Sequence, residues 1–422
     1  MTRIQALVTI ALFGASALAL SACATTKKQA EFTPSAEIIA LQDRLLTLDT
    51  HLDTPALLLR KGWSIDREHS VDQDGTDVDL PRMKKGGLDG GFWAIYTRQG
   101  PRTVDGYLKA RTHALRTADA IEKMIADDPA NFELALAADD APRIAAAGKR
   151  VVFISMENSF PLGSTPEALE TSMQEFYGLG VRLISPVHMT NNDLADSATD
   201  PKGAEWNGLS PLGKQFVAEA NQLGMVLDAS HASDAVFDQM LELSKAPIIL
   251  SHSGVSAVHK HPRNIDDARL RKLAKTGGVI QMNALSAYLV DTPKSLERDT
   301  ALAAMYAKYD FENLTARQGE TLTKERARID EAFPVPKARF DDYMAQVLHA
   351  LKVAGVDHVG IGADWDGGGG VTGMEDVSLI WRITERLHQE GYSEEDLQKI
   401  WSGNVLRVLK AAEAERDKEA RH

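Results

Sequence analysis

Side chains that can bind metal ions or carry protons stand at the ends of several short apolar runs of this sequence. They are His51 and Asp53 in LLTLDTHLD, Glu157 in VVFISME, His231 in MVLDASH, His252 in PIILSHS and Asp364 in HVGIGAD. Imidazole nitrogens and carboxylate oxygens are ligands that Zn²⁺ prefers, and Mn²⁺ or iron can also use them. The residue types therefore predict a site for two transition-metal ions, provided that the fold brings the ends of these runs together.

Spacing gives some of these residues a more definite role. His51 and Asp53 are two positions apart, so on an extended chain both side chains point to the same side and can hold one metal ion. The carboxylate of Glu157 has two oxygens and can bridge two cations. His231 and His252 each lie beside a serine after an apolar run, which suits a second pair of imidazole ligands. Each residue alone has an ordinary alternative, a hydrogen-bonded histidine or a solvated carboxylate, and only their matching positions favour the metal site.

Further polar side chains in comparable positions could act on a substrate. Asp364 can take a proton from a water molecule and deliver it to a leaving amine, and we favour it over Asp366 for this role. His188, at the end of ISPVH, could donate a hydrogen bond to a developing oxyanion. Arg263, in HPRNIDD, could bind a carboxylate through two parallel hydrogen bonds, although an arginine in a loop is usually solvated.

The apolar runs predict the elements that position these residues. The strand-like runs are residues 45–50, 91–96, 150–156, 181–187, 225–229, 247–251, 278–283 and 358–363. Helical patterns between them lie at residues 104–125, 167–178, 211–223, 235–244 and 266–276. Repeated strand–helix alternation predicts an α/β fold, a TIM-like (β/α)8 barrel, with a doubly wound open sheet as the main alternative. In a barrel of this kind the carboxyl ends of the strands share one face, where active sites are built.

Residues 289–339 interrupt this rhythm. The segment is long and highly charged, and parts of it, such as LTKERARIDEAF, have a helical pattern. We interpret it as a helical insertion after the seventh strand, which could be a lid, an interface element or a plain solvated helix pair. The predicted organisation is a signal peptide at 1–22, a lipidated tether at 23–40 and a single (β/α)8 domain at 41–415 that carries the metal site.

The amino terminus has the pattern of an export signal. Arg3 precedes ALVTIALFGASALALSA, an apolar stretch that is too short for a convincing membrane span. The stretch ends in LSAC, which resembles the bacterial lipobox, and Cys23 is the only cysteine of the chain. We therefore expect a lipid anchor on Cys23 that holds the protein to the membrane on the periplasmic side of the cell envelope. The outer membrane is favoured over the inner one, because Ala24 provides no acidic retention signal; an ordinary cleaved signal is the alternative.

Composition limits the remaining possibilities. The chain of 422 residues is 44% hydrophobic and 25% charged, which is a globular composition with enough apolar residues for a large core. Its formal charge of −13 argues against a nucleic-acid partner. The glycine-rich segment GADWDGGGGVTG does not have the Lys-Ser/Thr ending of a phosphate-binding loop, so we expect a flexible loop over a pocket there.

In this order, the residues resemble the renal (membrane) dipeptidase family of zinc peptidases. The matching stretches include LDTHLDTP, VDLPRMKKGGLDGGFWAIY, GVRLISPVHMTNNDLADS, PIILSHSGV, HPRNIDD and HVGIGADWDG, and they extend over most of the chain from about residue 45 to 410. The resemblance implies two Zn²⁺ ions, one held by His51 and Asp53 and the other by His231 and His252. It implies that Glu157 bridges the two ions, and it suggests a homodimer.

The resemblance also implies which residues act on the substrate. Asp364 would be the general acid–base, His188 would stabilise the tetrahedral intermediate, and Arg263 would hold the substrate carboxylate. Tyr96, in FWAIY, and Asn283, in QMNALSAYL, would bind the substrate, with a packed aromatic as the alternative for the tyrosine.

Two departures from the family pattern concern the pocket. Leu285 stands where the family often has a tyrosine, which leaves the substrate preference open. After Glu157 the sequence reads NSF in place of an expected glycine, so the loop there could reshape the pocket.

We therefore expect a zinc-dependent dipeptidase that hydrolyses the peptide bond of dipeptides through a hydroxide shared by two metal ions. One alternative is a metal-dependent hydrolase of the same barrel class that acts on N-acyl amino acids, lactones or β-lactams. Another is a non-enzymatic binding lipoprotein with a decayed site, against which the full set of ligands argues. A carboxylate clamp at Arg263 would favour the dipeptidase, because esterifying the carboxyl terminus of a dipeptide would then abolish its hydrolysis.

Overall fold

The computed structural model of the chain describes residues 32–419. The predicted signal peptide and Cys23 lie outside the described residues. The compact unit begins at Pro34, earlier than the predicted boundary at residue 41. Helix α1 (Ala36–Gln42) accounts for the difference, because its residues Ile38 and Leu41 are buried in the main core.

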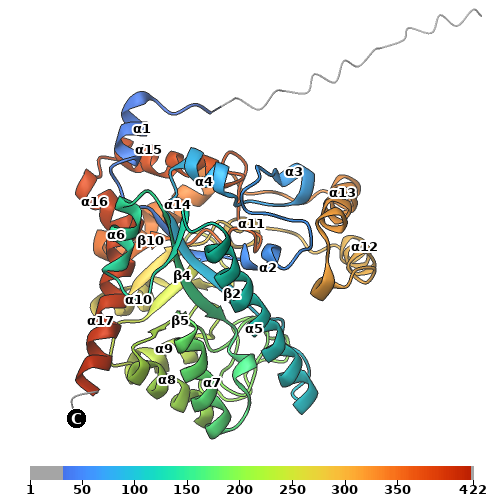
Figure 1. Cartoon of the computed structure of the whole chain (residues 1–422), viewed down its shortest axis with the longest axis vertical. Helices are drawn as coiled ribbons and strands as arrows, with labels where there is room; N and C mark the ends of the chain where they lie inside the picture. Colours follow the sequence, from blue (N-terminus) through green and yellow to red (C-terminus); the bar gives the residue numbers. More distant parts are fainter. Residues whose placement is uncertain (1–31, 420–422) are drawn as a thin grey trace, which may run out of the picture. The chain divides into compact units, whose positions relative to one another are not determined.

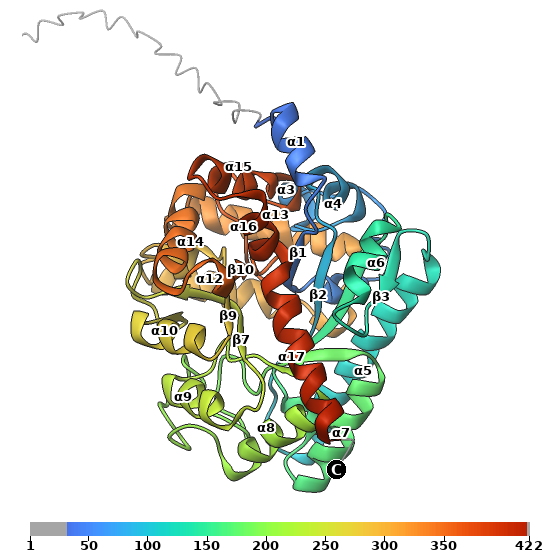
Figure 2. The same cartoon turned by 90° about the vertical axis from the view of Figure 1, so that its left-hand side faces the viewer.

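Parallel strands form the centre of this unit (Figures 1 and 2). The strands that follow one another around the barrel are β1 (Leu48–Leu52), β2 (Gly90–Tyr96), β4 (Arg150–Glu157), β5 (Val181–Ile184), β6 (Val226–Leu227), β7 (Ile249–Val255), β9 (Val279–Met282) and β10 (Val359–Ile361). Each overlaps one of the predicted strands. Most are buried along their full length, which agrees with their continuous apolar sequences.

Two short bridges join the sheet halves into a barrel. The first half runs β1-β2-β4-β5-β6, and the second runs β10-β9-β7, with the two-residue strand β8 (Asn264–Ile265) at its edge. A parallel bridge between Leu52 and Trp365 connects β1 to the end of β10, and one between Asp228 and Ile249 connects β6 to β7. The predicted TIM-like barrel is therefore confirmed, and the open doubly wound sheet is excluded.

Helices cover the outside of the barrel. The longer ones are α5 (Val104–Asp127), α7 (Pro166–Gly178), α8 (Pro211–Leu223), α9 (Asp234–Leu243), α10 (Asp267–Lys275), α14 (Phe340–Ala354) and α17 (Asn404–Glu419). Several begin at a residue whose side chain accepts a hydrogen bond from the first turn, as at Thr103, Ser210 and Asp266. The sequence patterns predicted helices α5, α7, α8, α9 and α10 closely, but they missed short elements such as β3 (Phe132–Leu134) and α6 (Asp140–Ala146).

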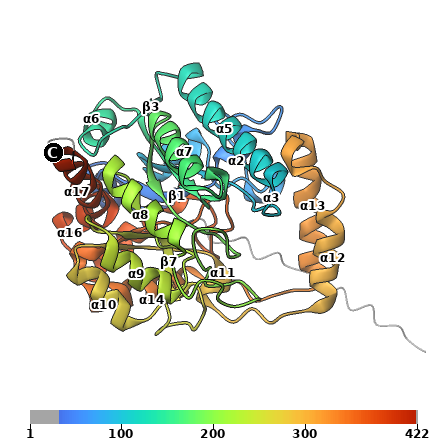
Figure 3. The same cartoon turned by 90° about the horizontal axis from the view of Figure 1, so that it is seen from below.

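The predicted insertion follows β9, which is the seventh strand around the barrel. The short helix α11 (Ser286–Leu289) ends where the predicted segment begins, and α12 (Leu296–Tyr306) and α13 (Ala316–Ala332) lie within it. Figure 3 shows α12 and α13 side by side at one edge, and α13 packs against the short helix α3 (Val71–Asp74). None of the helices between residues 32 and 419 is both long and apolar enough to cross a membrane.

Candidate metal centre and substrate pocket

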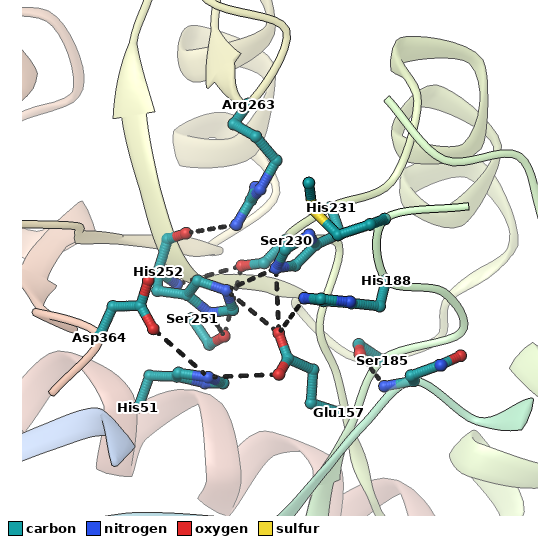
Figure 4. Close-up of polar contacts among 12 residues, drawn as sticks. His51, Glu157, Ser185, His188, Ser230, His231, Ser251, His252, Arg263 and Asp364 are labelled. Carbon is teal, nitrogen blue, oxygen red and sulfur yellow. Dashed lines mark hydrogen bonds and ion pairs between the residues drawn. The ribbon is translucent and has the colours of Figure 1, made fainter. Parts of the chain in front are cut away.

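The carboxyl ends of distant strands bring the predicted metal ligands together. His51 lies in β1, Glu157 ends β4 and His252 lies in β7. His231 follows β6 and Asp364 follows β10, and both have a positive φ, 66° and 68°. Backbone in this left-handed region is unusual for residues other than glycine and is found at functional sites. Figure 4 shows these side chains converging from separate elements.

Glu157 lies at the centre of the cluster, and its two oxygens face different partners. The Oε2 atom is 3.6 Å from Nε2 of His51. The Oε1 atom is 2.9 Å from Nε2 of His231 and 3.4 Å from Nε2 of His252. Asp53 lies on the His51 side, with its Oδ2 atom 3.6 Å from Nε2 of that histidine. The carboxylate therefore has the position of a bridge between two groups of ligands.

The nitrogen and oxygen atoms of the cluster are better suited to bind divalent cations than to form hydrogen bonds with one another. Both ring nitrogens of His51 and the Oδ1 atom of Asp53 are buried and have no hydrogen-bond partner among residues 32–419. The Nε2 atoms of His231 and His252 are only 2.8 Å apart and point to the same carboxylate oxygen. Three groups of ligand atoms compact enough to hold a metal ion are His51–Glu157–His252, Glu157–His188–His231 and His51–Asp53–Asp364. Buried polar atoms of this kind are normally satisfied, so the cluster is suited to metal ions.

The charges in the cluster lead to the same conclusion. Burial lowers the pKa values of His231 and His252 well below their usual range, which keeps both imidazoles neutral, as metal binding requires. For His51, burial opposes protonation, but the carboxylates of Glu157 and Asp53 outweigh it and raise its pKa. The His51 side of the site therefore favours a positive charge, which a cation would supply.

Asp364 is held at the edge of this cluster. Its Oδ1 atom is 4.0 Å from Nε2 of His51, and its Oδ2 atom accepts a hydrogen bond of 3.2 Å from the side-chain amide of Asn283. Burial raises the pKa of Asp364 to about 7. The competing candidate Asp366 lies in the same pocket, but its two oxygens accept hydrogen bonds of 2.6 Å from the Thr54 hydroxyl and the Asp77 backbone N–H. Asp364 is thus the better placed of the two for proton transfer.

Known proteins are similar to this chain in sequence and fold. A family model described as membrane dipeptidase, peptidase family M19, matches residues 35–422. The chain belongs to the membrane dipeptidase family. Dipeptidase tcpJ of Claviceps purpurea is 30% identical over 342 residues, which are 80% of this chain and 69% of the relative. The M19 membership makes the chain a metallopeptidase that cleaves the peptide bond of dipeptides.

One solved structure supports the same assignment, and a second supports the fold. The probable dipeptidase PvdM from Pseudomonas aeruginosa has a TM-score of 0.75 and 29% identity, over 90% of this chain and 98% of that one. A metallopeptidase from Rhodobacter sphaeroides, solved with a phosphinate mimic of the dipeptide L-Ala-D-Ala, has a TM-score of 0.68 and 24% identity, over 87% of this chain and 99% of that one. The second comparison supports the fold alone.

A cavity of about 440 Å³ lies over the candidate metal centre of this M19 protein. Its lining includes Tyr96, His188, Met189, Leu285 and Tyr288. The Nε2 atom of His188 is 3.8 Å from the Oε1 atom of Glu157, and the His188 ring lies 5.0 Å from that of Tyr96. Both Tyr96 and His188 therefore face the pocket.

Arg263 and Asn283 lie behind the pocket wall. Arg263 is 3% exposed, and its Nη2 atom donates to the backbone carbonyl of His252 at 3.0 Å. Among residues 32–419 it has no carboxylate partner, and its guanidinium lies 5.3 Å from the Tyr288 ring. Asn283 is fully buried, and its side-chain oxygen accepts a hydrogen bond from the backbone N–H of Leu285. Asn283 therefore holds Asp364 and the loop and does not line the cavity.

Asn158 and Leu285 are the two departures from the family pattern, and the structure shows how the first is accommodated and where the second lies. Asn158, at the position where glycine was expected, has a φ of 65°. Asparagine tolerates this left-handed conformation, and its side-chain amide donates a hydrogen bond to the Thr97 carbonyl at 2.9 Å. Leu285 separates the substrate pocket from a second cavity of about 1070 Å³, which is lined by the insertion and residues 368–372.

Sequence reasoning missed several residues that hold the ligands in place. Asp49 accepts hydrogen bonds from the backbone N–H groups of His51 and Ala363, so it ties β1 to the end of β10. Asp228 and Ser251 form a similar support behind His252. The available signal was an aspartate inside an apolar run shortly before a histidine, in LDTH and LDASH.

Proposed function

We propose that the protein hydrolyses dipeptides with a pair of divalent cations, for which Zn²⁺ is the favoured metal. His51 and Asp53 would hold one cation, and His231 and His252 would hold the other. Glu157 would be shared between them. The observation that carries this proposal is the position of Glu157, whose two oxygens face the two histidine groups separately. Imidazole-rich donor sets with carboxylates suit zinc better than calcium or magnesium, which prefer oxygen ligands.

When bound, the cations would supply a water molecule of lowered pKa and polarise the peptide carbonyl. The chain's own residues would manage the protons. Asp364 faces the cluster from β10 and would accept a proton from the attacking water and transfer it to the leaving nitrogen. In the metal-free site, burial raises the pKa of Asp364 to about 7, and a carboxylate beside the cluster is a group that can accept and release a proton.

The pocket side chains would orient the substrate. His188 lies 3.8 Å from Glu157 and faces the cavity, so it would donate a hydrogen bond to the oxyanion that develops at the carbonyl. Arg263 would attract the carboxyl terminus of the substrate from behind the wall, next to Tyr288. This buried cation would favour dipeptides over longer chains, because the carboxylate must lie close to the metal centre.

A panel of dipeptides tests the proposal directly. The protein is stripped with a chelator, reloaded separately with Zn²⁺, Mn²⁺ or Fe²⁺, and assayed for release of free amino acids. We expect hydrolysis that is lost on chelation, is restored by Zn²⁺ and is abolished when the dipeptide's carboxyl terminus is esterified. Lactones, β-lactams and N-acyl amino acids serve as comparison substrates, and preferential turnover of any of them would reject the dipeptidase assignment.

We also propose a location and an assembly. LSAC at residues 20–23 supports a lipid on Cys23, and the family match begins only at residue 35, which leaves the preceding segment free for a tether. The protein would be anchored in the envelope, facing the periplasm, at the outer membrane. Replacing Cys23 with alanine should move the protein from the membrane fraction to the soluble fraction. A homodimer is proposed from the family resemblance, and sedimentation equilibrium of the mature protein tests it.

A further inference from the structure

A chain of three buried polar groups lies behind His252. The Ser251 hydroxyl is 2.6 Å from the Oδ2 atom of Asp228 and 2.8 Å from the Nδ1 atom of His252. All three residues are at most 2% exposed, so water does not compete for these contacts. The contacts join neighbouring strands of the barrel, because Asp228 follows β6 and the other two residues lie in β7. Figure 4 shows Ser251 directly below the His252 ring.

The direction of each hydrogen bond follows from the number of available hydrogens. The Oδ1 atom of Asp228 accepts the backbone N–H groups of Ser230 and Ser251, both at 2.9 Å, so the carboxylate serves as an acceptor. A serine hydroxyl has one hydrogen to donate. The contact of 2.6 Å to Asp228 uses that hydrogen, in preference to the contact of 3.3 Å to the Ser230 hydroxyl. Ser251 must then accept a hydrogen bond from Nδ1 of His252.

We infer that Asp228 and Ser251 are positioning residues that fix the tautomer of His252. With the hydrogen held on Nδ1, the lone pair of a neutral imidazole lies on Nε2. That atom faces the cluster, 2.8 Å from Nε2 of His231 and 3.4 Å from Glu157. Supporting hydrogen bonds of this kind orient metal ligands and raise their affinity. The inference rests on the proposed metal site and adds the reason why His252 presents its lone pair to that site.

His231 and His252 differ in whether a hydrogen bond supports the Nδ1 atom of the ring. The Nδ1 atom of His231 is buried and has no hydrogen-bond partner in the described part of the chain. Its neighbour Ser230 is as deeply buried as Ser251, but the Ser230 hydroxyl accepts the backbone N–H of His252 at 3.1 Å and does not support an imidazole nitrogen. Ser230 is therefore a matched control: the same residue type, the same burial and the same position before a histidine.

Three variants of the mature protein distinguish the loss of the Asp228–Ser251–His252 hydrogen bonds from a general disturbance of the fold. Zn²⁺ affinity is measured by competition with a chromophoric chelator, and Co²⁺ absorption reports the ligand field. Ser251→Ala removes the acceptor for Nδ1 and should weaken binding at the His252 site by about 10-fold or more. Ser230→Ala should stay within about 3-fold of the wild type.

Asp228→Asn gives the sharper test. The two backbone N–H groups would keep the amide oxygen in the place of Oδ1, so the NH2 group would face Ser251 and donate to it. The serine hydrogen would then turn to Nδ1 of His252, which would place the imidazole hydrogen on Nε2. This variant should therefore lose at least as much affinity as Ser251→Ala. Equal Zn²⁺ affinity of wild type, Asp228→Asn and Ser251→Ala would overturn the inference, as would an equal loss in Ser230→Ala.

A measurement on the metal-free wild-type protein tests the inference even if a variant fails to fold. Two-bond ¹H–¹⁵N spectra of protein labelled with [¹⁵N]histidine distinguish the two neutral tautomers, and His252→Asn assigns the signal. We expect the Nδ1–H form at His252, and the Nε2–H form would overturn the inference while leaving the proposed dipeptidase intact. If the wild-type protein itself bound neither Zn²⁺ nor Co²⁺, both the proposed metal centre and the positioning role of Asp228 and Ser251 would be rejected.

Discussion

Replacing Gly367 with alanine tests how closely the loop after β10 approaches the carboxylates of the site. A Cβ atom at this position would lie 2.1 Å from the Oδ2 atom of Asp53 and 2.3 Å from the Oδ1 atom of Asp364. Because real Cβ atoms keep at least 3.0 Å from other heavy atoms, the two oxygens must move by about 0.9 Å and about 0.7 Å. The backbone of Gly367 does not have a positive φ, so the strain comes from the contacts alone.

The displacement affects a proposed metal ligand and the proposed general acid–base together. A misplacement of about 1 Å can cost roughly 100-fold in rate, which corresponds to about 2.7 kcal/mol in the activation free energy. We expect Gly367→Ala to lower kcat/KM for a dipeptide by about this factor and to weaken Zn²⁺ binding. Its cost in folding stability should be about 1–3 kcal/mol, as for other overpacked sites.

The assay compares kcat/KM, Zn²⁺ affinity and the midpoint of chemical unfolding in three proteins. The control is Gly178→Ala at the end of α7, where an added Cβ would meet nothing within 4 Å. It should match the wild type in activity and metal binding. A Gly367→Ala protein with wild-type kcat/KM and metal affinity would refute the placement of Asp53 and Asp364 around this glycine.

The remaining predictions concern proton transfer, substrate binding, pH and metal content. Asp364→Asn should lower kcat by about 10²–10⁴-fold with little change in the affinity for a non-hydrolysed dipeptide mimic measured by calorimetry, and unchanged turnover would exclude it as the acid–base. Arg263→Gln should raise KM by about 10-fold or more in steady-state assays, because the buried positive charge that would attract the substrate carboxylate is lost, and an unchanged KM would remove Arg263 from substrate binding. In the metal-free protein, burial raises the pKa of Asp366 from 3.8 to about 6, so the folded state binds more protons than the unfolded state between these values. The stabilisation by the protonated carboxyl is complete below pH about 4 and is lost as the pH rises through about 6. The unfolding free energy should therefore fall by up to about 3 kcal/mol over this range. Urea titrations should show a smaller fall for Asp366→Asn, and equal pH profiles of the variant and the wild type would contradict the assignment. Chelation should lower the Tm in calorimetry because it leaves the carboxylates of Asp53 and Glu157 without a cation, and Zn²⁺ should restore it; a Tm insensitive to chelator would argue against a metal bound in the native state.

Local sequence was sufficient to predict most of the barrel. Buried parallel strands are apolar along their whole length, so each run could be recognised without knowledge of its neighbours. Helices α5, α7, α8, α9 and α10 had both periodic apolar positions and capping residues, such as Ser210 before α8. Strand β3 was missed because three residues carry too little periodicity, and α1 was missed because its short apolar face lies in an otherwise polar segment.

The sequence by itself determined which residue types stand at the strand ends, and hence the metal-type chemistry of His51, Glu157 and His252. Only the tertiary structure decided how these groups are oriented. The contact of Asp228 with Ser251, the close approach of Gly367 to Asp53 and the position of Arg263 behind the pocket wall all depend on the packing of separate elements. Hydrogen-bond directions and contacts below 3 Å are set by the register between neighbouring strands, and no local pattern encodes a distance between residues that are far apart in the chain.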